Sequence, residues 1–128
     1  MSEPLVYVGT YRIREGKLEP FRQLEKEIAE FVEANEPQIL AFASYISDDG
    51  TKACGIQIHP NSESMATHLD VAGPRFGQVM EFIEDVRIEI YGPPSASLRE
   101  RMTQMAQMSG ASLTFNEPHA GFSRLPTD

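Results

Sequence analysis

The order of strand-like and helix-like segments constrains the fold of this chain more than any other feature of its sequence. Four segments are rich in β-branched and aromatic residues with the alternation of strands: 5–14, 38–47, 51–59 and 84–92. Residues 18–37 carry apolar side chains at helical spacing, and a second helical pattern begins at residue 62. This order predicts an α+β fold of the ferredoxin-like type, in which a four-stranded antiparallel sheet carries two helices on one face.

Turn and cap residues support these boundaries. The sequence DDG at residues 48–50 separates the second and third strands and predicts a tight hairpin, because Asp and Gly tolerate the positive φ of such turns. Asn61 precedes the second helical pattern and has the side chain of an N-cap. Gly73 and Pro74 interrupt that pattern, so we expect the second helix to break at residues 71–76 and to resume beyond them.

Both faces of the predicted sheet carry apolar side chains. In the first strand, Val6 and Val8 alternate with Leu5, Tyr7, Tyr11 and Ile13. Two helices cover one face only, and an uncovered apolar face would be an exposed patch. We therefore predict a symmetric homodimer in which the bare faces of two sheets pack together. The alternation does not tell which set of side chains faces the helices.

A third helix is expected in the C-terminal extension that follows the core. Ser97 and Glu100 have the spacing of a capping box, and Gly110 has the position of a helix end. The apolar side of this helix would be formed by Leu98, Met102 and Met105.

The last part of the chain contains two short extended pieces within residues 111–125. One of them is expected to lie along a sheet edge or to reach the partner subunit. With 128 residues, the chain has the length of a single domain. We expect one domain over residues 1–128, made of a core at 5–92 and an extension at 93–128.

Composition excludes some partners. The formal net charge is −8 and the pI is near 4.8, which argues against nucleic acids and anionic membrane surfaces as partners. No secretion signal and no apolar run of about 20 residues is present, so we expect a cytoplasmic protein outside the membrane. The single cysteine, Cys54, lies in an apolar alternating run and is interpreted as core packing.

The βαββαβ order and the segment HPNSESMATHLDVAGPRFGQVMEFI at residues 59–83 make the chain resemble the antibiotic biosynthesis monooxygenase-like family. The resemblance covers about residues 5–92. It implies a dimeric α+β barrel. The family includes cofactor-independent oxygenases that act on electron-rich aromatic polyketides, haem-degrading enzymes and members with no assigned activity, so the resemblance implies one of these for the chain.

The residues that match the family's functional positions differ from its pattern. His59 stands where family oxygenases commonly have Trp, and Met80 stands close to the position of the haem-ligating histidine. In the first strand, Gly9 and Thr10 replace the Asn of haem-degrading members. The resemblance therefore argues against haem degradation, and we expect no cofactor.

His59 and His68 are the candidate catalytic bases, because a neutral imidazole can accept a proton near neutral pH. His59 ends a strand before Pro60, and we expect it at the rim of a cleft between sheet and helices. His68 shares a helical face with apolar residues and should lean toward the sheet. For each histidine, a purely structural role stays open.

The candidate substrate-binding residues surround the same predicted cleft. They are Tyr7, Tyr11, Arg75, Phe76 and Met80, of which a Tyr or Arg75 could stabilise an oxyanion. His119 lies in a loop without an evident partner. No His or Cys spacing of a metal site occurs, so we expect no metal.

Two functions follow from these residues. The first is a homodimeric enzyme that binds an apolar aromatic or polyketide-like molecule, removes a proton with a histidine, and lets the carbanion react with oxygen or cyclise. The second is a non-catalytic binding or structural dimer of the same fold. In that case the pocket would be filled by Phe21, Met65, Phe76 and Met80.

Overall fold

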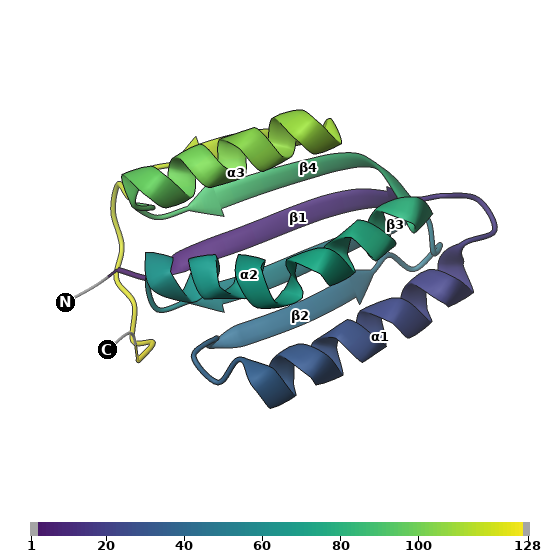
Figure 1. Ribbon diagram of the computed structural model, residues 1–128, viewed down its shortest axis with the longest axis horizontal. Helices are drawn as coiled ribbons and strands as arrows, with labels where there is room; N and C mark the ends of the chain where they lie inside the picture. The colour runs from purple at the N-terminus through teal and green to yellow at the C-terminus, as the bar shows by residue number, and fades with distance from the viewer. Residues whose placement is uncertain (1–2, 127–128) are drawn as a thin grey trace.

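The computed structural model describes residues 3–126. Its elements, in chain order, are β1 (Leu5–Ile13), α1 (Leu18–Asn35), β2 (Ala41–Ile46), β3 (Lys52–His59), α2 (Ser62–Val79), the short 3₁₀ helix η1 (Met80–Phe82), β4 (Ile83–Tyr91), α3 (Ala96–Ser109) and β5 (Ser112–Asn116). The first six main elements have the predicted βαββαβ order, which confirms the ferredoxin-like fold (Figure 1).

The sheet has five strands in the order β2-β3-β1-β4-β5. The pairs β2–β3, β3–β1 and β1–β4 are antiparallel, as expected, whereas β5 pairs with β4 in parallel. The predicted four-stranded antiparallel core is therefore confirmed, and one of the extended pieces expected after Gly110 lies along a sheet edge as β5. Its pairing is parallel because α3 carries the chain back along the sheet, so this piece enters in the direction of β4.

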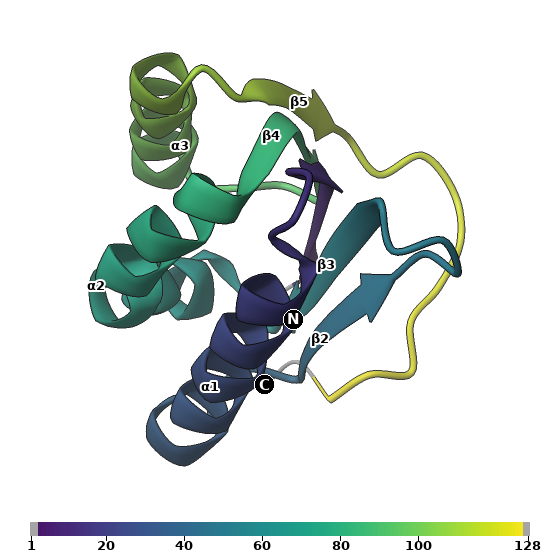
Figure 2. The same cartoon turned by 90° about the vertical axis from the view of Figure 1, so that its right-hand side faces the viewer.

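All three helices lie on the same face of the sheet (Figure 2). In β1, the side chains of Leu5, Tyr7, Tyr11 and Ile13 are buried under them, while Val6 and Val8 on the opposite face are only half-buried. Tyr45 and Tyr91 also belong to this uncovered face and are 57% and 40% exposed. The structure thus settles which side chains face the helices.

Cys54 is only partly buried and lies on the uncovered face, where it pairs with Thr10 and Tyr45. Its neighbour Ala53 is the residue that enters the core under the helices. The interpretation of Cys54 as core packing is therefore wrong for a single chain, because strand alternation points its thiol away from the helices.

The second helix differs from its prediction. It runs without a break from Ser62 to Val79 and contains Pro74. Proline removes one intrahelical hydrogen bond, but Ala72 and Val79 on either side of it are buried against the sheet, and this packing keeps the helix continuous. At its start, the Asn61 side chain accepts a hydrogen bond from the Ser64 N–H, which confirms the expected cap.

The N-cap of the third helix lies two residues earlier than expected. The side chain of Ser95, not that of Ser97, accepts the hydrogen bond from the Leu98 N–H. Leu98 and Met102 are buried as expected, but Ala106 completes the buried stripe, and Met105 stays exposed. Gly110 ends the helix in the left-handed conformation with φ of 76°, as a glycine at this position readily does.

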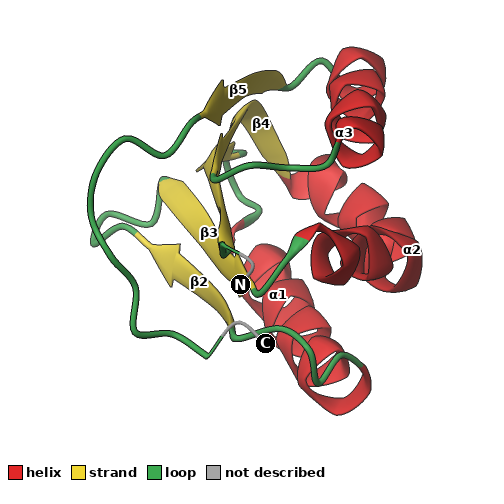
Figure 3. Cartoon of the chain, turned by 90° about the vertical axis from the view of Figure 1, so that its left-hand side faces the viewer, coloured by secondary structure: helices red, strands yellow, loops and turns green. Residues whose placement is uncertain are grey.

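Beyond β5, residues 117–126 form no further strand and are exposed. This segment passes on the side of the sheet that carries no helix (Figures 2 and 3). The second extended piece expected near the C-terminus is therefore present only as a loop. Among residues 3–126, no helix has the length and hydropathy needed to cross a membrane.

Candidate functional site

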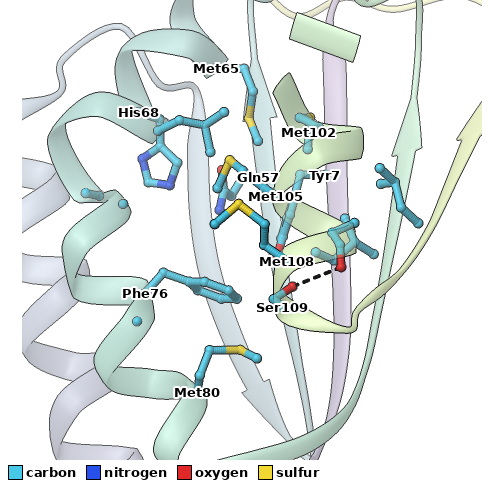
Figure 4. Close-up of a pocket in the computed structure, with 17 residues that line it drawn as sticks. Tyr7, Gln57, Met65, His68, Phe76, Met80, Met102, Met105, Met108 and Ser109 are labelled. Carbon is cyan, nitrogen blue, oxygen red and sulfur yellow. Dashed lines mark hydrogen bonds between the residues drawn. The ribbon is translucent and has the colours of Figure 1, made fainter. Parts of the chain in front are cut away.

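A cavity of about 350 Å³ lies between α2, α3 and the sheet (Figure 4). Most of its lining is apolar, and the polar side chains among its lining residues are Tyr7, Gln57, His68 and Ser109. The remaining side chains come mainly from α2, α3 and β5; they include Met65, Leu69, Phe76, Met80, Met102, Met105, Met108 and Leu113. We call this the main cavity.

Five of the six methionines of the chain line the main cavity. Methionine side chains are flexible and polarisable, so such a wall can adapt to an irregular apolar ligand. Met65, Phe76 and Met80 lie on the wall and leave the volume open, while Phe21 belongs to the core between α1 and the sheet. The pocket is thus not filled in the way that the structural alternative required.

A histidine and a carboxylate meet at the main cavity. His68 projects from α2, and its Nδ1 lies 3.0 and 3.1 Å from the two carboxylate oxygens of Glu36. The side chains are only 9% and 0% exposed, respectively. An Nδ1–H that donates to a carboxylate leaves Nε2 as the acceptor of the neutral ring. No hydrogen-bond partner of Nε2 occurs among the described residues, and the His68 side chain lines the cavity.

Glu36 follows the last residue of α1 and adopts a non-helical conformation with φ of −130°. Its backbone N–H still bonds to the Val32 carbonyl, and Pro37 prevents the helix from continuing. This cap position turns the carboxylate under α2 instead of toward solvent. Glu36 was not predicted from the sequence, because helical periodicity does not set the direction of its side chain and its partner His68 lies 32 residues away.

His59 does not lie at a rim. It is fully buried, because the N-terminal turn of α2 covers the end of β3. Its Nδ1 lies 2.7 Å from the Ser64 hydroxyl and its Nε2 lies 2.9 Å from the Gln57 amide oxygen. Burial, together with the nearby His68 ring, lowers the pKa of His59 to about 3. The imidazole is therefore neutral at neutral pH, and it does not line the main cavity.

Tyr7 and Tyr11 form a buried pair on β1. Their hydroxyl oxygens are 3.1 Å apart above Gly9. A Cβ at Gly9 would collide with the Tyr11 hydroxyl and lie 2.7 Å from that of Tyr7, so only glycine leaves room for the pair. Burial is the main cause that raises the pKa of Tyr7 to about 12 and that of Tyr11 well above its usual value. Both phenols therefore remain protonated and can donate hydrogen bonds.

A second, smaller cavity of about 50 Å³ adjoins the main cavity. Tyr7, Gln57, His68, Ala72 and Phe76 line both, so these side chains separate the two spaces. Its own lining adds Tyr11 and Glu25, and burial raises the pKa of the Glu25 carboxyl. We call this space the inner chamber; its volume suits one or two water molecules.

Of the other residues singled out in the sequence, Phe76 and Met80 line the main cavity. Arg75 does not. Its guanidinium lies 3.4 Å above the ring of Phe31 on α1, which is a cation–π contact outside both cavities. His119 lies in the exposed loop after β5. Within residues 3–126, no three His, Cys, Asp or Glu side chains gather in a metal-binding arrangement.

No protein-family model matches the chain, and no curated protein matches it either. Solved structures do. MupZ from Pseudomonas fluorescens is 19% identical, superposes with a TM-score of 0.75, and the match covers 95% of both chains. SnoaB from Streptomyces nogalater, described as a cofactor-independent oxygenase, is 12% identical with a TM-score of 0.61, over 74% of this chain and 99% of SnoaB.

A third structure, described as an antibiotic biosynthesis monooxygenase, is 14% identical with a TM-score of 0.60, over 67% of this chain and 94% of its own length. At these identities, the likeness shows a shared fold. The MupZ match includes both the core and the C-terminal extension, since it covers nearly the whole chain. The chain therefore has the fold that the resemblance implied, the fold of the antibiotic biosynthesis monooxygenase-like proteins.

Proposed function

We propose that this chain is an acid–base enzyme that removes a proton from an apolar aromatic or polyketide-like substrate bound in the main cavity. The observation that carries the proposal is the His68–Glu36 pair, with Nδ1 at 3.0 Å from the carboxylate and the ring on the cavity wall. A carboxylate behind a histidine fixes the ring tautomer and stabilises the imidazolium that forms when the ring takes a proton.

In this mechanism, Nε2 of His68 accepts a proton from a carbon of the substrate. The negative charge of Glu36 stabilises the resulting imidazolium, and the mostly apolar lining places few polar groups beside the carbanion. Tyr7 lines the same cavity and holds a protonated phenol, so it can donate a hydrogen bond to the oxygen on which the charge develops. His59, also expected as a candidate base, has no part in the proton transfer.

We propose that the chain uses this proton removal in an oxygenase reaction. The carbanion would react with O2, so that a CH2 group and O2 become a C=O group and water, without an external reductant. The description of SnoaB as a cofactor-independent oxygenase of the same fold supports this form. A cyclase or isomerase would use the same base and the same oxyanion donor, and differs only in the fate of the carbanion.

The expected assembly is a homodimer. Its support is the uncovered face of the sheet, where the apolar side chains of Val6, Val8 and Tyr45 are half-buried or exposed in the single chain. A second copy of the sheet would cover this face. Sedimentation equilibrium would give twice the chain mass if this is correct, and a monomer mass would contradict it.

The proposed activity can be tested with dithranol, a dihydroxyanthrone whose CH2 group is acidic. Oxidation in air is followed by absorbance with the wild type, His68→Gln and the matched control His119→Gln in the exposed loop. Loss of the base should lower kcat/KM by about a hundredfold or more, while the control keeps the wild-type value. Glu36→Gln should lower kcat with little change in KM, since Glu36 acts through His68.

Two results would contradict the proposal. Equal rates for wild type and His68→Gln would show that the histidine is not the base. Tight binding of dithranol by the wild type without any turnover of it, or of related enolisable ketones, would instead favour a non-catalytic binding protein.

A further inference from the structure

We propose that Gln57 selects and orients the substrate by donating its amide N–H to a carbonyl or enolate oxygen next to the carbon that His68 deprotonates. The inference rests on the proposed function and assigns the substrate a chemical class. That class is an apolar ring system whose acidic C–H lies beside a ketone or phenol oxygen.

The first argument is position. Gln57 lies on β3 two residues before His59, so strand alternation points both side chains toward the helices. Gln57 lines the main cavity and the inner chamber, as His68 and Tyr7 do. Figure 4 shows the Gln57 amide and the His68 ring on the wall of the main cavity. A ligand in reach of the base is therefore also in reach of this amide.

The second argument is orientation. A neutral His59 has one N–H, and the Ser64 hydroxyl at 2.7 Å can donate to Nδ1. The N–H then resides on Nε2 and donates to the Gln57 oxygen at 2.9 Å. An amide whose oxygen is held on one side presents its NH2 group on the other. Among the described residues this NH2 group has no hydrogen-bond acceptor. The hydrogen bonds therefore run in one direction, from Ser64 to His59 and from His59 to Gln57, and the NH2 group of Gln57 is left to donate to a bound ligand.

The third argument is the chemistry of the wall. Either hydroxyl can donate in the Tyr7–Tyr11 contact, and when Tyr11 donates to Tyr7 the proton of Tyr7 stays free to donate to a ligand. Tyr7 reaches the main cavity, so the site offers two donors, Tyr7 and Gln57, beside one base. No Lys or Arg is among the described residues that line the cavity. Such a wall favours a neutral ligand oxygen that becomes negative during the reaction over a permanent carboxylate or phosphate.

Alizarin, a hydroxyanthraquinone dye whose colour changes when its phenol ionises, is a direct probe of this arrangement. The fraction of phenolate in the bound dye is titrated by absorbance with the wild type, Gln57→Leu and Gln57→Met. Gln78→Leu is the matched control, because Gln78 is an exposed residue of α2 outside both cavities. A lost hydrogen bond to the anion should lower the phenolate-to-phenol ratio about tenfold or more in both Gln57 variants, with no change in the control.

Ser64→Ala tests the positioning role, because it keeps Gln57 and removes the hydroxyl that fixes the His59 tautomer. It should shift the dye ratio in the same direction by a smaller amount, a spectroscopic change that loss of stability alone would not produce. If the dye binds with the same ratio in the wild type and in Gln57→Leu or Gln57→Met, the inference is refuted and the His68 mechanism stands. If the wild type binds no dye, both the inference and the proposed substrate class are refuted.

Discussion

The burial of His59 allows a quantitative prediction of how the free energy of unfolding changes at acid pH. In the folded chain its pKa is about 3, and its ordinary value is 6.5. Below pH 6.5, the unfolded chain therefore binds a proton that the folded chain excludes until about pH 3. Because the unfolded state binds more protons, the free energy of unfolding falls as the pH falls through this window.

The magnitude follows from the same two values. One proton corresponds to about 1.4 kcal/mol per pH unit, so a difference of 3.5 in pKa amounts to about 5 kcal/mol over the whole window. Between pH 6.5 and pH 5, the contribution of His59 is about 2 kcal/mol. This is a large part of the stability of an ordinary domain, which is about 5–15 kcal/mol.

The assay is urea unfolding at a fixed protein concentration and at several pH values between 7 and 5, for the wild type and His59→Gln. The variant keeps a polar side chain but cannot titrate, so its free energy of unfolding should fall less steeply by about 1.4 kcal/mol per pH unit at the acid end of this range. The comparison uses slopes, and a lower absolute stability of the variant does not affect it. His119→Gln in the exposed loop is the control and should keep the wild-type slope. Equal slopes for the wild type and His59→Gln would refute the argument from burial.

Two further substitutions test local features of the fold. Gly9→Ala places a Cβ against the hydroxyls of Tyr7 and Tyr11, so we expect a loss of about 1–3 kcal/mol in thermal unfolding; an unchanged Tm would show that the phenols move aside freely. Ser95→Ala removes the observed N-cap of α3 and should destabilise the chain by about 1 kcal/mol, whereas Ser97→Ala should have little effect; the reverse ranking would restore the capping box predicted from the sequence.

The parts of the fold that depend on neighbouring residues were predictable from the sequence. The hairpin at residues 48–50 and the cap at Asn61 are confirmed, because each is decided within a few residues of chain. The break at Pro74 was wrong, since the local penalty of a proline is outweighed by the packing of buried residues before and after it. The residues next to Pro74 in the sequence do not indicate how much the packing of α2 against the sheet stabilises the helix.

The site was predictable only in part, for the same reason. The helical face of His68 follows from periodicity, whereas alternation grouped Tyr7 with Leu5, Tyr11 and Ile13 without telling whether this set faces the helices. Both His68 and Tyr7 lie at the main cavity. The role of Glu36 depends on a contact between two helices, and the burial of His59 depends on where α2 begins to cover β3. Gln57 could have been noticed as a polar residue on the same strand face as His59, but its orientation depends on the Ser64 hydroxyl from α2.

Two separate stretches of the chain, residues 5–92 and residues 96–116, form the two sides of the main cavity. The side chains to which we assign the proposed chemistry, Tyr7, Glu36, Gln57 and His68, all lie within residues 5–92. The opposite wall, with Met102, Met105, Met108 and Leu113, comes from α3 and β5. These two elements form one continuous cassette, residues 96–116, which contains none of those side chains. If the proposed function is correct, replacing this cassette would change the shape of the ligand that fits while leaving the proposed proton-transfer groups in place, so that new substrates are acquired without a change in the chemistry.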